Sequence, residues 1–181
     1  MRVIEKRKTA KNLTFSALLL ALCILLPMLT GEIPQIGNAL CPMHIPVLLC
    51  GFICGPAYAS VVGLIAPPLR FALFGMPPLI PVGTAMCFEL AVYGAVSGLL
   101  YASLPKKTGF IYVSLITAMI AGRIVWGVAM LTVLRVSGQY FTWELFIAGA
   151  LINAVPGIVL HIVLIPVLVF ALKRSRLLAA R

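Results

Sequence analysis

Apolar runs long enough to cross a lipid bilayer fill nearly all of this 181-residue chain, and its basic residues gather at three polar breaks. A helix that spans the hydrocarbon core needs about 20 predominantly apolar residues. Only 10% of the residues are charged, whereas a soluble domain carries roughly 25%. The sequence therefore predicts an integral membrane protein. Its functional residues are expected among the few polar side chains that lie within or beside the membrane.

The spacing of the polar breaks predicts an all-α fold, an integral membrane bundle of six transmembrane helices. The second helix is short for a full span, and Gly55-Pro56 predicts a turn directly after it. Pro67-Pro68 predicts a kink or an end in the third helix, because proline lacks a backbone donor and clashes with the preceding turn. The expected helices cover about residues 13–29, 44–54, 57–74, 82–104, 110–136 and 145–172.

The basic residues predict the orientation, because Lys and Arg in short loops stay on the cytoplasmic side. An even number of crossings places all three clusters on one side, so both termini are expected to be cytoplasmic. Topology and attraction to anionic lipid then explain the net charge of +10, and no nucleic-acid partner is needed. The expected parts are a basic cytoplasmic N-terminus (1–12), a transmembrane domain (13–172) and a basic cytoplasmic C-terminus (173–181). The clusters are Arg2, Lys6, Arg7, Lys8 and Lys11; Lys106 and Lys107; and Lys173, Arg174, Arg176 and Arg181.

The N-terminal stretch resembles a signal peptide, but no convincing cleavage site follows it, so the first helix is expected to remain as an anchor. The five cysteines contain no C-x-x-C motif, and most lie in apolar helices where a thiol behaves as a small hydrophobe. The spacing Cys41-x-x-His44 hints at a metal site, but zinc or copper needs further convergent ligands. We therefore predict no metal.

Intramembrane polar residues are costly and are functional candidates by default. Glu89 and Arg123 lie at depths from which their side chains can meet, so two interpretations stay open: a structural ion pair, or ligand contact by at least one of them. His161 lies deeper, and an interhelical hydrogen bond is the favoured interpretation. Three outer loops (30–43, 75–81 and 137–144) are expected to cover a site that opens outward. The candidate substrate-binding residues are Glu32, Asn38, His44, Arg70, Glu89, Arg123 and Asn153.

Small residues four apart, such as Ala17 and Ala21 or Gly94 and Gly98, allow helices to approach closely. With the segments CPMHIPVLLCGFICGP (41–56) and GMPPLIPVGTAMCFELAVYG (75–94), the Ala17-x-x-x-Ala21 pattern makes the chain resemble an S component. S components are the substrate-binding subunits of energy-coupling factor (ECF) vitamin transporters. The resemblance covers essentially the whole span of six helices and lies closest to the broad family that includes pantothenate-type members.

This resemblance implies a chain in the bacterial plasma membrane that captures a small vitamin, with a slight preference for pantothenate, at the outer face. It also implies that Ala17 and Ala21 pack against a coupling transmembrane subunit. The chain has no G-x-x-x-x-G-K-[ST] phosphate loop, and the resemblance implies that two cytoplasmic ATPases hydrolyse ATP in its place. No cofactor is expected on this chain.

Two other classes of protein were weighed against this interpretation. An intramembrane enzyme is disfavoured because the sequence contains no H-E-x-x-H motif and no Ser-His pair at a suggestive spacing. A self-sufficient secondary transporter or channel remains the alternative, with Glu89, Arg123 and His161 as a proton relay. No convincing inverted repeat supports it.

Overall fold

The computed structural model describes residues 2–29, 40–105, 107–138, 140, 142–149 and 154–174. Within these residues the chain is helical and contains no β-strand, which confirms the all-α class. The elements are α1 (Arg2–Leu29), α3 (His44–Cys54), α4 (Pro56–Phe74), the short turn η1 (Leu79–Gly83), α5 (Thr84–Ser103), α6 (Thr108–Val136), α7 (Trp143–Ile147) and α8 (Val155–Arg174).

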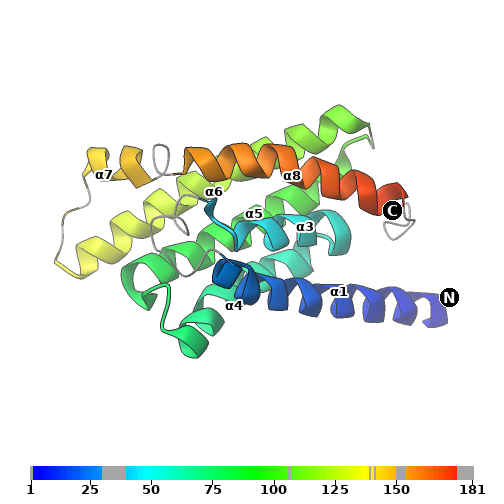
Figure 1. The fold of residues 1–181 in the computed structure, drawn as a ribbon, viewed down its shortest axis with the longest axis horizontal. Helices are drawn as coiled ribbons and strands as arrows, with labels where there is room; N and C mark the ends of the chain where they lie inside the picture. The colour runs from blue at the N-terminus through cyan, green and yellow to red at the C-terminus, as the bar shows by residue number, and fades with distance from the viewer. Residues whose placement is uncertain are drawn as a thin grey trace.

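Five segments of the described chain are long and apolar enough to cross a membrane, and α3 is a shorter apolar helix. The N-terminal end of α1 and the C-terminal end of α8 lie at the same end of the bundle (Figure 1). Six crossings and cytoplasmic termini stay predictions. The five candidate spans are Lys8–Met28, Pro56–Phe74, Leu79–Ser103, Thr108–Val136 and Val155–Arg174.

Two expected helix limits differ from the structure. α1 begins at Arg2 instead of near residue 13, because the Glu, Lys and Arg residues that precede the apolar run are good helix formers. The helix expected over 57–74 does end at Phe74, with Pro67 and Pro68 inside it, so of the kink or end predicted at the prolines the end is absent. In place of one helix over 145–172, the structure gives α7 and α8 as separate elements, and residues 150–153 between them lie outside the described residues. Pro156 lies in the first turn of α8, where its missing N–H costs nothing.

Helix α5 lies at the centre of the bundle and contacts α3, α4 and α6. Gly94 and Gly98 of α5 face the start of α4, where an added Cβ would overlap the backbone of Ala59 and Pro56 respectively. The two helices therefore approach at backbone distance, as the predicted small-residue spacing requires.

Helix α3 packs among α1, α4, α5 and α8, and ten of its eleven residues are buried. The expected turn after it is present, since Gly55 adopts a φ of 96° that a side chain would strain. This turn sends the chain back along α4. The arrangement places the first residue of α3, His44, against side chains of α5 and α8.

Candidate functional site

An ion pair between α5 and α6 forms the centre of the candidate site. Glu89 Oε1 lies 3.1 Å from Arg123 Nη1, and the two side chains are 1% and 15% exposed. Sequence analysis left a structural pair and ligand contact open for these residues. The structure shows the pair, which leaves the charges of these two side chains balanced.

Two histidines extend the ion pair toward α3 and α8. His44 Nε2 lies 3.6 Å from Glu89 Oε1, which is too long for a hydrogen bond. The His44 and His161 rings stack with their centroids 5.9 Å apart and an interplanar angle of 22°. His161, expected to make an interhelical hydrogen bond, thus brings α8 into contact with α3 through its ring.

Tyr93 of α5 also belongs to the cluster and contacts two of its members. Its ring meets His44 edge-on at a centroid distance of 5.2 Å, and its hydroxyl contacts the Glu89 carboxyl group. Gly122 of α6 provides the space for this ring, because a Cβ at Gly122 would overlap the ring carbons of Tyr93. Sequence analysis missed Tyr93, although its position four residues after Glu89 places both on one helix face.

Cys41 borders the cluster just before α3. Arg123 Nη2 donates to Cys41 Sγ at 3.8 Å. Burial raises the pKa of the Cys41 thiol above its ordinary value, so the thiol stays protonated at neutral pH and Glu89 alone supplies the charge that balances Arg123. Among the described residues, no group of three or more His, Cys, Asp or Glu side chains is arranged to hold a metal ion.

Several buried polar atoms of the cluster make no hydrogen bond within the part of the chain that the structure describes. They belong to both histidines and to both members of the ion pair. Such atoms are rare in folded proteins because each costs free energy when it is removed from water. The atoms are His44 Nδ1 and Nε2, Glu89 Oε1, Arg123 Nε and His161 Nε2. Of these, Glu89 Oε1 is compensated by its ion pair with Arg123.

The other candidate site residues have different positions. Arg70 is buried near the end of α4, where its guanidinium lies 5.7 Å from the centroid of the Phe74 ring. Glu32, Asn38 and Asn153 lie outside the described residues. The structure therefore brings together three of the seven predicted residues, namely His44, Glu89 and Arg123, and adds Cys41, Tyr93 and His161 to them.

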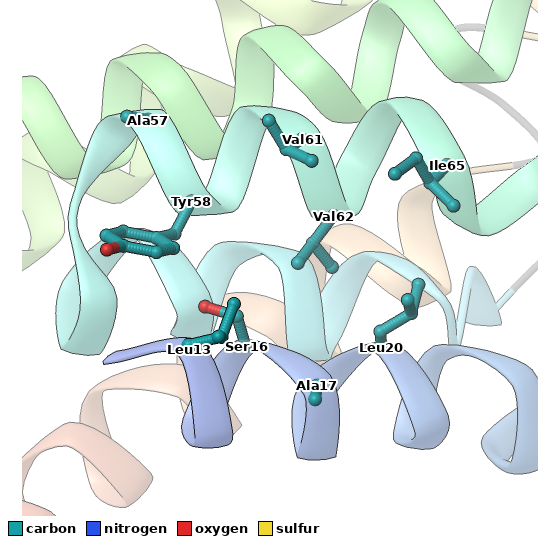
Figure 2. Close-up of a pocket in the computed structure, with 9 residues that line it drawn as sticks. All are labelled: Leu13, Ser16, Ala17, Leu20, Ala57, Tyr58, Val61, Val62 and Ile65. Atoms are coloured by element: carbon teal, nitrogen blue, oxygen red, sulfur yellow. The ribbon is translucent and has the colours of Figure 1, made fainter. Parts of the chain in front are cut away.

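The predicted partner-interface residues lie on α1, which contributes no residue to the polar cluster. Ala17 and Ala21 are both exposed on α1. Ala17 also lines a surface cavity of about 430 Å³ between α1 and α4 (Figure 2). We call this cavity the α1–α4 groove. It is lined by Leu13, Ser16, Ala17 and Leu20 of α1 and by Ala57, Tyr58, Val61, Val62 and Ile65 of α4.

Comparison with protein families found one match that spans most of the chain. The family model described as "ECF transporter, substrate-specific component" matches residues 11–170. The search of curated proteins found no match. The search of solved structures found none either.

Proposed function

The chain belongs to the family of ECF transporter substrate-specific components, and from this premise we propose that it captures a small vitamin at the outer membrane face and delivers it inward. A coupling transmembrane subunit and two cytoplasmic ATPases supply the energy, since this chain carries no phosphate loop of its own. The protein works in the bacterial plasma membrane, binds no cofactor and catalyses no reaction itself.

The observation that carries this proposal is the buried polar cluster of His44, Glu89, Arg123 and His161. Besides Glu89 Oε1, which the Arg123 guanidinium compensates, it contains four buried nitrogen atoms that make no hydrogen bond within the described chain. Each such atom costs about 1–3 kcal/mol when it remains unpaired. A ligand that offers matching donors and acceptors recovers this cost. We therefore assign the cluster to the polar end of the substrate site.

The chemistry of the cluster favours a ligand that both donates and accepts hydrogen bonds. Glu89 Oε1 accepts, Arg123 Nε donates, and a neutral imidazole does both. An amide and hydroxyl groups suit this pattern, which supports the slight preference for pantothenate. We assign a ligand carboxylate to Arg70 or Arg123, because a guanidinium binds carboxylates with paired hydrogen bonds.

The proposed ligand contacts also include Asn153 on the last transmembrane segment and Glu32 and Asn38 in the first outer loop. We propose that the outer loops cover the bound ligand while the protein carries it inward across the membrane. These assignments follow from the sequence and the family resemblance.

We propose that the coupling subunit docks on the exposed face of α1 at Ala17 and Ala21. Both residues are small and exposed, and small residues let a neighbouring transmembrane helix approach to backbone distance. The site for the partner and the site for the ligand are then on different helices. Changes at one can be tested without altering the other.

A native mass spectrum of the protein, gently extracted from its own host membrane, tests the proposed function. We expect a vitamin-sized adduct, and in a second set of peaks the added masses of a coupling subunit and two ATPases. The adduct mass identifies the vitamin. The Glu89→Gln variant should weaken ligand binding about tenfold, since a lost buried hydrogen bond costs about 1–3 kcal/mol.

The matched control is Glu144→Gln, because Glu144 is an exposed glutamate on α7 and its replacement should leave the adduct unchanged. A stable homo-oligomer that carries neither a vitamin nor another chain would contradict the proposal and favour the self-sufficient carrier. Equal loss of the adduct in both variants would remove Glu89 from the site.

A further inference from the structure

The charges of the buried polar cluster balance each other within the chain. Glu89 Oε1 lies 3.1 Å from Arg123 Nη1, so the carboxylate compensates the guanidinium. The rings of His44 and His161 stack with their centroids 5.9 Å apart, and two imidazolium ions this close together, beside a guanidinium, would repel one another. The cluster therefore offers a substrate no positive charge that lacks a counter-ion.

Most of the hydrogen-bonding capacity of Arg123 is used inside the protein. Its Nη1 faces Glu89, and its Nη2 donates to Cys41 Sγ at 3.8 Å. Its Nε is buried and makes no hydrogen bond within the described chain. A carboxylate binds a guanidinium best through two parallel N–H···O bonds, whereas Nε supplies a single N–H. One donor suits the oxygen of an uncharged carbonyl or hydroxyl group.

A ligand carboxylate in the cluster would lie close to the carboxylate of Glu89. Two carboxylates that share a site repel each other, and a buried charge without an opposite charge is costly. An uncharged amide or hydroxyl group avoids both costs. Its oxygen can accept from Arg123 Nε, and its N–H or O–H can donate to an imidazole, since His44 Nδ1 and His161 Nε2 make no hydrogen bond within the described chain.

We propose that Glu89 determines the charge selectivity of the substrate site, so that the polar cluster binds an uncharged end of the substrate and excludes a carboxylate. This inference rests on the proposed function, because it names the kind of chemical group that enters the proposed vitamin site. Of the two arginines to which a ligand carboxylate was assigned, Arg123 is then excluded and Arg70 remains.

Arg70 lies at a different depth from the cluster. Helices α4 and α5 pass each other at Gly63, where an added Cβ would overlap the backbone of Leu90, the residue after Glu89. Arg70 follows Gly63 by seven residues, which is roughly 10 Å along the helix axis. A substrate with its carboxylate at Arg70 therefore has its uncharged end roughly 10 Å away, so the substrate class is an elongated molecule with one charged end.

Acetamide and acetate test the charge selectivity, because the two probes have similar shapes and differ in charge. The purified full chain is unfolded by heat in a mild detergent at about pH 8, where an ordinary imidazole is neutral, with sodium chloride keeping the ionic strength constant. Each probe is added in a concentration series, and its dissociation constant follows from the shift in unfolding temperature. We expect acetamide to raise the unfolding temperature of the unmodified chain, and acetate to have no more effect than chloride.

Three variants identify the residue responsible. Glu89→Gln keeps the shape of the side chain and leaves the charge of Arg123 without a counter-ion, so the preference should reverse, with acetate bound roughly tenfold more tightly than acetamide. The double variant Glu89→Gln and Arg123→Gln contains neither charge and should lose the preference for acetate. The matched control Glu144→Gln, at an exposed position on α7, should behave like the unmodified chain.

Equal effects of the two probes on the unmodified chain, or a larger effect of acetate, would overturn the proposal. A Glu89→Gln variant that is folded by circular dichroism and still prefers acetamide would do the same. If that variant does not fold, the two probes on the unmodified chain decide alone. No vitamin or coupling subunit takes part in this test, so a missing vitamin adduct counts against the proposed function alone, and a preference for acetate counts against the role of Glu89 alone.

Discussion

A double-mutant cycle on Glu89 and Arg123 measures the interaction free energy between the two residues. Removing one partner of a buried ion pair typically costs about 3–5 kcal/mol, because the other charge is left uncompensated. Glu89 is 1% exposed and Arg123 is 15% exposed. Arg123→Gln leaves the more deeply buried charge, that of Glu89, without a partner, so this variant should lower the free energy of unfolding by about 5 kcal/mol. Glu89→Gln should lower it by about 3 kcal/mol.

The double variant removes both charges and leaves two neutral amides that can bond to each other. The decrease in the free energy of unfolding in the double variant should be smaller than the sum of the two single decreases by about 3 kcal/mol, which is the upper end of the range for residues in direct contact. The assay is reversible unfolding in mixed micelles, with the free energy of unfolding extrapolated to zero denaturing detergent. Glu144→Gln, at an exposed position on α7, should change this free energy by less than about 0.5 kcal/mol.

Losses that add within about 0.5 kcal/mol would refute this reasoning, because independent sites behave in that way. Such a result would mean that the 3.1 Å contact between the two side chains contributes nothing to stability. The two residues would then have to be explained separately.

Two further predictions concern the helix surfaces. Gly122→Ala should lower the free energy of unfolding by about 1–3 kcal/mol, because its Cβ displaces the ring of Tyr93. The control Gly109→Ala, in the same helix, adds a Cβ that meets no atom within 4 Å, and it should raise the free energy of unfolding by up to about 1 kcal/mol. Thermal unfolding in detergent compares the two variants, and equal effects would contradict the packing described. Replacing both Ala17 and Ala21 with leucine should abolish vitamin uptake by cells while ligand binding by the purified chain persists, since bulk at a close helix contact blocks docking. Normal uptake in that variant would remove the proposed interface.

The sequence predicted the parts of the fold that depend on hydropathy and turn chemistry. The limits of α3 and the turn at Gly55 agree with the structure because a short apolar run ends at Gly-Pro. The end of α6 at Val136 agrees as well. The assignment of α7 and α8 as separate elements was not predicted, because the described residues on both sides are as apolar as those of a continuous helix.

The contact between Glu89 and Arg123 was foreseeable because helix rise alone gives the depth of each residue. The participation of Tyr93, Cys41 and His161 depends on how each helix is rotated about its axis. Hydropathy says little about rotation in a bundle whose helices are apolar on most faces.

The burial of α3 has a consequence for how the protein is made. At about 1.5 Å per residue its eleven residues span only about 16 Å, roughly half of the hydrocarbon core. A segment this short cannot settle in a bilayer alone, and it becomes stable only when its neighbours enclose it. His44 therefore reaches Glu89 at the end of assembly, so a newly synthesised chain acquires its polar cluster only after the surrounding helices have been inserted.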